Sequence, residues 1–397
     1  MLTIDATNHG SRECPEFHPQ ECMQCGVCVA SCAHKALATV RRGAKFAIAV
    51  DADKCVGCGL CSRVCPAGFV PADRINFDAI SDSNAFLSFA SDKAVSYAAS
   101  SGGTIRALAT RFAARPNSFV YSLRKSPDGP IPDILDATTV SEMPNSIYAP
   151  TMWGQNLNKA RRLGTADRLL IIGLPCQIKG ARKLLAAVRC KVFTIAIICR
   201  KTKDFRFADY VKRYHHLANG EPWVFRGYGW PGIIGNPDGA HSDYSQFSAI
   251  PFGLDIWNVS ACSRCADCLA TDVADLSVGD PWGIDRANRN GCNFLLANTP
   301  AGEDLLAEAA DDITLEPLSA DEALAVIDRN AVNRKVDRLR YYTGLDKRFK
   351  TVLKYKALQL KSALAGSFVT AVGHTRPGAA ACRLLLAFDK RIKNLLR

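Results

Sequence analysis

Short apolar segments alternate with helical patterns between about residues 96 and 330. Two of these segments, Arg168–Gly173 and Val192–Cys199, are almost wholly apolar, which is typical of strands buried on both faces of a sheet. Further strands are predicted at Phe119–Leu123 and Ala274–Val278, and helices at Thr104–Arg115, Lys179–Val188 and Phe205–Leu217. This alternation predicts an α/β domain with a mainly parallel sheet.

The segments before and within this domain have a different character. Residues 1–75 contain a predicted hairpin, with strands at Ala38–Arg41 and Phe46–Val50 and a turn around Gly43. Residues 76–95 are small and polar, which predicts a linker or an interdomain surface. Residues 227–240 are rich in glycine and proline, which predicts a long loop.

The C-terminal part of the chain has helical periodicity. Helices are expected at Ser319–Asn330, Asn333–Tyr342 and Asp346–Leu364, and the last segment, Ala380–Arg397, has an amphipathic helical pattern. Ser319 and Glu322 have the spacing of a capping box at the start of the first of these helices. The sequence therefore predicts three parts, at residues 1–75, 96–330 and 331–397.

The composition argues against two classes of protein. Of the 397 residues, 48% are hydrophobic and 22% are charged, which is ordinary for a folded protein and unlike a disordered one. The longest apolar runs fall well short of the roughly 18 residues that a membrane-spanning helix needs. The N-terminal sequence MLTIDATNHGSRE lacks the pattern of a secretion signal, so we expect a cytoplasmic protein.

The positive charge is concentrated at one end of the chain. The formal net charge is +12, but Arg334–Arg397 alone contains 16 Lys/Arg and 3 Asp/Glu, so the first 333 residues carry a net charge of −1. A basic amphipathic helix is typical of a membrane-surface contact or of docking to an acidic protein partner. A solvated helical face is the remaining interpretation. We expect no nucleic-acid partner, because no basic patch has interleaved aromatic residues.

Cysteine is the most informative residue type. Nine of the 17 cysteines precede residue 66, and eight of these form two runs with the spacing C-x2-C-x2-C-x3-C. This is the bacterial ferredoxin pattern, in which the fourth cysteine of each run binds the other cluster. We therefore predict an α+β ferredoxin-like head with one [4Fe–4S] cluster on Cys22, Cys25, Cys28 and Cys65 and a second on Cys32, Cys55, Cys58 and Cys61. The alternative is a pair of structural zinc sites, which also use C-x2-C pairs.

Three later segments carry further motifs. They are Ser100-Ser101-Gly102-Gly103, Gly173-Leu174-Pro175-Cys176-Gln177, and Cys262-x2-Cys265 followed by Ala274-Asp275, Gly279-Asp280 and Trp282-Gly283. Over roughly residues 95–300 these segments together resemble the coenzyme F420 hydrogenase/dehydrogenase beta-subunit family, in which a ferredoxin head is a common arrangement. The resemblance implies an α/β flavoprotein domain that binds FAD and one further [4Fe–4S] cluster, followed here by the basic helical C-terminal region.

The resemblance also implies the residues of these sites. The third cluster would be held by Cys176, Cys199, Cys262 and Cys265, with Cys268 as an alternative ligand. The FAD contacts would be Ser100, Ser101, Gly102, Gly103, Thr104 and Tyr148, with Asp280 nearby. Ile147 stands where the family often has lysine before this tyrosine, so one charged contact to the flavin is missing.

The function implied by the resemblance is that of an iron–sulfur flavoprotein oxidoreductase. It would pass electrons between a one-electron carrier such as ferredoxin, or a reduced deazaflavin, and a small organic substrate. A flavin exchanges electrons singly or in pairs, whereas iron–sulfur clusters carry one at a time, so the combination suits such a task. The alternatives are a non-catalytic electron-transfer subunit and a zinc-binding interaction protein. The motifs indicate neither the substrate nor a catalytic acid.

Overall fold

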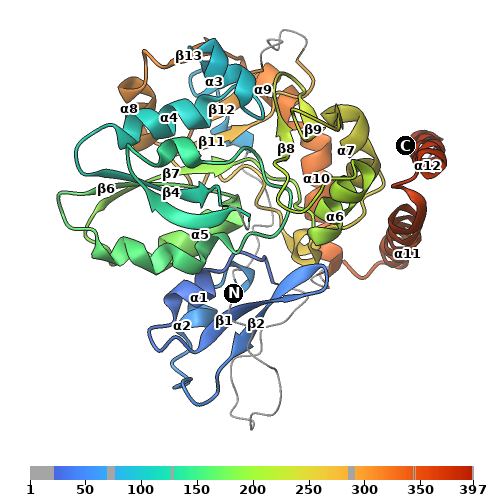
Figure 1. Ribbon diagram of the computed structural model, residues 1–397, viewed down its shortest axis with the longest axis horizontal. Coiled ribbons are helices and arrows are strands. Elements are labelled where there is room, and N and C mark those ends of the chain that lie inside the picture. The colour runs from blue at the N-terminus through green and yellow to red at the C-terminus, as the bar shows by residue number, and fades with distance from the viewer. Residues whose placement is uncertain are drawn as a thin grey trace.

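The computed structural model describes residues 22–68, 77–126, 129–284, 291–342, 344 and 346–395. Figure 1 shows the head below a large sheet domain, and two long C-terminal helices to one side. The start of the predicted head and the last two residues of the chain lie outside the described residues. None of the described helices is long and apolar enough to cross a membrane.

The head contains two short helices and a hairpin. These are α1 (Val27–Ser31), β1 (Leu37–Arg42), β2 (Lys45–Val50) and α2 (Leu60–Arg63). β1 and β2 pair antiparallel, which confirms the predicted hairpin. Gly26 and Gly59 immediately precede α1 and α2 with φ of 76° and 68°, a left-handed conformation that favours glycine. The two cysteine runs therefore begin their helices in the same way.

An eight-stranded sheet forms the centre of the molecule, in the order β13-β3-β12-β11-β7-β6-β4-β5. Its strands are β3 (Ala85–Ala90), β4 (Ser118–Arg124), β5 (Ile131–Leu135), β6 (Arg168–Gly173), β7 (Lys191–Ile197), β11 (Leu276–Gly279), β12 (Asn293–Ala297) and β13 (Ile313–Pro317). Only β4, β6, β7 and β11 run parallel to one another, and the other pairings are antiparallel. The sheet is therefore mixed, and the prediction of a mainly parallel sheet is wrong.

The prediction of a linker at residues 76–95 is also wrong. β3 lies within this segment and pairs with both β12 and β13, and Leu87 and Ser88 are buried. The strand is only six residues long, and the serine, aspartate and asparagine residues on both sides of it dominate the local composition. The predicted loop at 227–240 likewise contains a strand. β8 (Val224–Gly227), β9 (Ile233–Gly235) and β10 (His241–Asp243) form a small three-stranded sheet.

Helices cover both faces of the large sheet. The remaining helices are α3 (Lys93–Ala98), α4 (Thr104–Ala113), α5 (Pro175–Leu184), α6 (Phe205–Tyr214), α7 (Tyr244–Gly253), α8 (Pro300–Glu308), α9 (Ala320–Ile327), α10 (Arg329–Tyr342), α11 (Phe349–Val372) and α12 (Arg376–Leu395). α4 and α8 share one apolar core with the sheet, and α5 shares another with α1 of the head. The predicted capping box at Ser319 and Glu322 is confirmed at α9.

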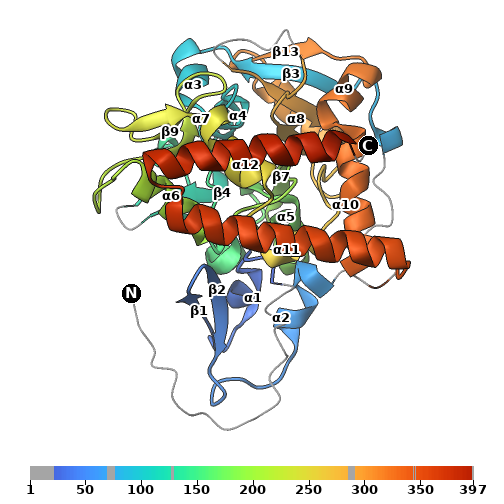
Figure 2. The same cartoon turned by 90° about the vertical axis from the view of Figure 1, so that its right-hand side faces the viewer.

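The last two helices extend a separate apolar core. α6, α7, α11 and α12 pack around Trp257, Val369 and Leu386. Figure 2 shows α11 and α12 lying side by side across one side of the body. The predicted helices at Asp346–Leu364 and Ala380–Arg397 are both present, with the bounds Phe349–Val372 and Arg376–Leu395.

Candidate functional site

The four cysteines of the first predicted set lie close together in the head. Cys25 and Cys28 are buried, and burial raises the pKa of both thiols, that of Cys25 to about 12. Neighbouring Cys22 and Cys65 raise the pKa of both further. Cys61 of the second run raises the pKa of Cys28 as well, so the two runs lie against each other in the head.

The second predicted set surrounds one apolar pocket. Cys32, Cys55, Cys58 and Cys61 all line it, together with residues of β1, β2 and the 56–60 loop. The backbone N–H of Ala36 donates a 3.3 Å hydrogen bond to Cys32 Sγ, of the kind that stabilises a thiolate. Cys58 is exposed and Val56 beside it is 61% exposed. This set therefore lies nearer the molecular surface than the first set, in which Cys25 and Cys28 are buried.

The arrangement of the thiols bears on the choice between an iron–sulfur cluster and a zinc ion. Across the residues that the structure describes, no group of three His, Cys, Asp or Glu side chains is placed to hold one metal ion. A four-iron cluster needs its thiols spread around a cube rather than converging on a point. A pocket lined by four thiols fits that requirement better than a single tetrahedral ion does.

The third predicted set gathers at one edge of the large sheet. β6, β7 and β11 are parallel neighbours, so their carboxyl ends meet at the same edge. Cys176 lies in the first turn of α5, directly after β6, and Cys199 follows β7. Cys262 lies in the short helix η5 (Ser260–Arg264), and Cys265 directly follows it. The sheet topology thus brings together cysteines that are far apart in the sequence.

Mutual effects among the thiols show how close they are. Burial is the main cause of the raised pKa of Cys176, and Cys265, Cys199 and Cys262 each raise it further. Burial likewise raises the pKa of Cys265, to about 11. Cys268 stays an alternative ligand, because it also raises the pKa of Cys199 and its carbonyl accepts a 3.0 Å hydrogen bond from the N–H of Cys199.

Two lysines that the sequence did not indicate stand beside this set. Lys179, in α5, forms a 2.6 Å ion pair with Asp267, which ties the helix carrying Cys176 to the cysteine loop. Lys335, in α10, faces the thiols of the third set and Cys268. Burial alone would lower the pKa of Lys335, but these thiols raise it above its ordinary value. The third set therefore has a fixed positive charge at its side.

The head docks on the body next to the third set. α1 packs against α5 and against the helical segment η4 (Trp153–Arg162). Val27 is fully buried there, because Gly154 and Gly180 leave room for its side chain. Cys25 of the first set also raises the pKa of Cys176 of the third. The first and third sets are therefore neighbours across the interface between head and body.

The predicted flavin residues divide into two groups. Ser101 Oγ donates a hydrogen bond to Cys292 O, Thr104 Oγ1 bonds Ser88 Oγ, and the N–H of Thr104 donates to Asn293 Oδ1. A Cβ atom at Gly102 would lie 2.6 Å from Cys292 Cα, and Gly103 caps α4 with φ of 76°. These residues hold the first turn of α4 against the segment before β12. The hydroxyl groups of Ser101 and Thr104 already form hydrogen bonds within the protein, so they are not available to a ligand.

The second group meets at Arg226, a residue that the sequence did not indicate. Ser100 Oγ donates to the carbonyl of Arg226, and Asp280 pairs with its guanidinium at 2.5 Å. Tyr148 stacks on Tyr244, over which the same guanidinium lies at 4.7 Å. Burial alone would lower the pKa of Arg226, but Asp280 and the two tyrosines raise it above its ordinary value.

Arg226 retains binding capacity. It is 1% exposed, and its Nη2 finds no hydrogen-bond acceptor among the described residues. Trp230 and Trp282 lie beside it with their ring centroids 5.0 Å apart and their planes tilted by 40°, and Trp282 is 45% exposed. A buried arginine with a spare donor suits a phosphate or a flavin carbonyl, and an exposed indole suits contact with a planar ring. The residues around Arg226 therefore fit a flavin nucleotide better than the first turn of α4 does.

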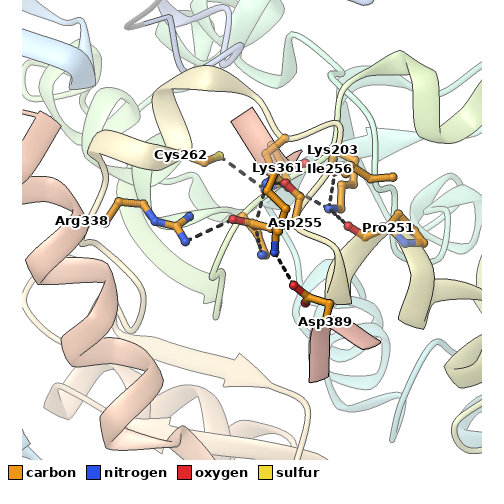
Figure 3. A network of polar contacts seen from close by, with 11 residues as sticks. Lys203, Pro251, Asp255, Ile256, Cys262, Arg338, Lys361 and Asp389 are labelled. Carbon is orange, nitrogen blue, oxygen red and sulfur yellow. Dashed lines mark hydrogen bonds and ion pairs between the residues drawn. The ribbon is translucent and has the colours of Figure 1, made fainter. Parts of the chain in front are cut away.

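A network of buried charges lies beneath the third set (Figure 3). The ammonium of Lys203 is fully buried and donates three hydrogen bonds of 2.8 Å, to Pro251 O, Ile256 O and Asn258 Oδ1. Asp255 pairs with Lys201 and, at 3.2 Å, with Arg338 of α10. The N–H of Thr202 donates to Cys262 Sγ at 3.5 Å. The network fixes the chain after Cys199, the Cys262 loop and α10 to one another.

A cavity of about 300 Å³ opens between this network and α11. Arg206, Asp255, Trp257, Ser263, Arg338 and Tyr355 are among its lining residues. The volume is at the lower end of the range of small-molecule sites. Ser263 directly follows Cys262, so the cavity borders the third cysteine set.

Comparisons with known proteins give one match to the head and one to the domain of the large sheet. Residues 166–322 match the family that comprises the C terminus of the beta subunit of coenzyme F420 hydrogenase/dehydrogenase, and residues 16–71 match a 4Fe-4S dicluster domain. Two separate segments of the chain thus match two families, one in the head and one in the domain of the large sheet. The resemblance inferred from the motifs is thereby confirmed. The matched beta-subunit domain begins at β6 and contains all four cysteines of the third set, and the dicluster domain contains the first two sets.

One solved structure shares the fold over about two thirds of this chain. It is a chain from the F420-reducing [NiFe] hydrogenase complex of Methanosarcina barkeri, studied by xenon derivatization. The TM-score is 0.52 and the identity 16%, over 67% of this chain and 92% of that chain. At this identity the likeness establishes the fold and not the activity. The comparison with curated proteins gives no match.

Proposed function

We propose that the chain is an iron–sulfur flavoprotein oxidoreductase. It would hold three [4Fe–4S] clusters and FAD, and pass electrons between a ferredoxin-type carrier or a reduced deazaflavin and a small organic substrate. Clusters move single electrons and a flavin moves one or two, which is the chemistry that the bound groups would supply. The residues of the chain supply the order, the spacing and the electrostatic environment of the sites.

The succession of the three cysteine sets carries this proposal. The second set lies at the surface, where an external protein carrier can approach Cys58. The first set shares the head with it and is buried against the body. Cys25 of the first set in turn neighbours Cys176 at the sheet edge. Such a series, from an exposed to a buried position, is the arrangement that a one-electron path requires.

The flavin end of the path is proposed at Arg226. Asp280 follows β11 directly, and Cys199 follows the neighbouring parallel strand β7. A Cβ atom at Gly279 would lie 2.9 Å from Ile198 Cβ, so these two strand ends are in close contact. Arg226 and Asp280 would therefore place a flavin at the same sheet edge as the third set. The buried Nη2 of Arg226 would donate to the flavin nucleotide.

A non-catalytic electron-transfer subunit is the second candidate. The solved structure that shares the fold is one chain of a multi-subunit hydrogenase complex. Tyr97, Tyr228 and Trp282 are also exposed near Arg226 and would suit a protein interface. In that case the substrate would bind to a partner protein, and the flavin would exchange electrons across the interface.

Quantifying the bound groups tests the proposal. The full chain is purified without oxygen, and iron, sulfide and acid-released flavin are measured per chain. Three clusters predict about 12 iron atoms, and the flavin site predicts about one FAD. Cys262→Ser should lower the iron content to about eight while Cys268→Ser leaves it unchanged. Eight iron atoms in the unchanged protein would refute the third cluster, and no flavin would refute the site at Arg226.

A second measurement separates the two candidates. The flavin absorbance is followed after adding reduced ferredoxin, reduced deazaflavin or a reduced nicotinamide. Bleaching by one of them, followed by reoxidation with small organic acceptors in the absence of any other protein, would support the enzyme. Bleaching without any turnover, and turnover only after a partner protein is added, would support the electron-transfer subunit.

A further inference from the structure

The outer faces of α11 and α12 expose an unusual amount of apolar surface. Twelve large hydrophobic side chains are exposed in the described part of the chain, and seven of them belong to these two helices. They are Phe349, Leu353, Leu360, Leu364 and Phe368 on α11 and Leu384 and Phe388 on α12. Phe349 is 79% exposed and Leu384 73%, so these side chains do not contribute to the core.

These residues form one stripe along each helix. On α11 they recur at intervals of four or seven residues, which keeps them on one side of a helix with 3.6 residues per turn. The opposite sides, with Ala365 and Val369 on α11 and Cys382 and Leu386 on α12, pack into the same apolar core. Both stripes therefore face outward from the same side of the body, the side turned to the viewer in Figure 2.

The two helices are held together as a unit. Lys361 of α11 and Asp389 of α12 form a 2.8 Å ion pair between them. Asp389 is the one acidic residue between 349 and 395, and it is buried. Lys350, Lys354, Lys356, Arg383, Lys390 and Arg391 are all exposed along the edges of the stripes. The outer face is thus apolar along its middle and exclusively positive in charge.

We propose that α11 and α12 dock the protein flat onto an anionic lipid bilayer. Apolar side chains flanked by lysine and arginine are the pattern of helices that lie in the interface of a membrane. The stripe on α11 runs from Phe349 to Phe368, about 30 Å along the helix, rather than forming a compact patch with a polar rim as protein interfaces do. The positive edges match negatively charged headgroups.

Vesicle flotation with the full iron-loaded chain tests this surface. We expect the protein to float with vesicles of equal parts phosphatidylcholine and phosphatidylglycerol, and to stay behind with phosphatidylcholine alone. Leu360→Gln with Leu364→Gln should abolish flotation, because these exposed side chains would enter the acyl region. Lys354→Gln with Lys356→Gln should weaken binding about 25-fold, since each basic side chain near an anionic surface contributes about fivefold.

A matched control keeps the outcomes distinct. Arg161→Gln with Arg189→Gln removes the same charge from exposed sites outside these helices and should leave flotation unchanged. Equal iron content in all variants shows that the fold is intact. Equal flotation with both vesicle types, or none, would overturn the proposal. The proposal would also be overturned if the protein bound no vesicles but formed a dimer, or a complex with an acidic protein, that the Leu360→Gln/Leu364→Gln variant does not form. None of these outcomes depends on the flavin or the third cluster.

Discussion

Replacing Asp255 with asparagine should loosen the helix that borders the third cysteine set. Asp255 pairs with Lys201 and Arg338, and Asn258 Nδ2 donates to its carboxylate at 2.8 Å. Its φ is 61°, a left-handed conformation that asparagine tolerates, so Asp255→Asn adds no backbone strain. The substitution therefore removes the negative charge and little else.

The magnitude follows from the pKa of the carboxyl group. Burial would raise this pKa, but Lys201 and Arg338 lower it from its ordinary value of 3.8 to about 2. A shift of this size corresponds to about 2 kcal/mol of stability when the group is ionised. This figure already contains the loss of both ion pairs, so we expect α10 to lose about 2 kcal/mol of local stability in total.

Hydrogen–deuterium exchange measures this loss locally. Amides of α10 should exchange at least about 30-fold faster in the variant, while those of β4 and β6 stay unchanged. The difference should be equal at pH 5 and pH 7, because both lie above 3.8. The contribution of the lowered pKa is lost only as the pH falls from about 4 towards about 2.

A second, more exposed pair provides the control. Glu142 pairs with Arg124 at 3.2 Å, and its side chain is 42% exposed, so Glu142→Gln should cost less than about 1 kcal/mol. Unchanged exchange of α10 in Asp255→Asn, or an equal effect in both variants, would refute the view that this buried network holds α10 in place.

Three further predictions concern single residues. Arg226→Gln should release the proposed flavin and destabilise the fold by about 3–5 kcal/mol, because Asp280 loses its ion-pair partner. Arg41→Gln, whose pair with Asp209 is 46% and 55% exposed, should do neither; flavin content and thermal unfolding check both variants. Burial lowers the pKa of His215 to about 4, so between pH 7 and pH 5 the unfolded chain binds a proton that the folded protein does not. The free energy of unfolding should therefore fall by about 2 kcal/mol over this range. In His215→Phe the pH dependence of the unfolding midpoint should flatten. A positive charge at Lys335 favours the reduced form of the proposed third cluster. In a redox titration, Lys335→Gln should therefore lower the reduction potential of that cluster by an amount on the order of tens of millivolts, whereas Lys335→Arg should leave it unchanged.

The sequence predicted the parts whose signal is local or periodic. β6 has the predicted bounds, Arg168–Gly173, because a continuous apolar run between polar turns leaves little choice. The spacing of the cysteine runs predicted a two-cluster head, which the match to a 4Fe-4S dicluster domain supports, and the assignment of cysteines to each cluster stays a prediction. β3 was missed since its six residues lie among serine, aspartate and asparagine, and its partners β12 and β13 come more than 200 residues later.

The residues missed at the site have no local signal. Arg226 lies in the short strand β8, and its partner Asp280 is 54 residues away in the sequence. Lys335 lies on a helix rich in basic residues, where nothing distinguishes it from Arg334 or Arg338. Arg226 and Lys335 reach Asp280 and the third cysteine set only because the fold brings these distant segments to one edge of the sheet. Tertiary placement of this kind cannot be read from composition or periodicity.

Both cysteine runs reach the seam between the head and the body, but in different ways. Val27 of the first run places its side chain against Gly154 and Gly180, whereas Val64 of the second run approaches Gly180 with its backbone carbonyl. A Cβ atom at Gly180 would lie 3.1 Å from Val27 Cγ2 and 3.4 Å from Val64 O, so one small residue on α5 accommodates both runs at once. A larger side chain at this single position would therefore push the whole head outward, and with it Cys25 away from Cys176.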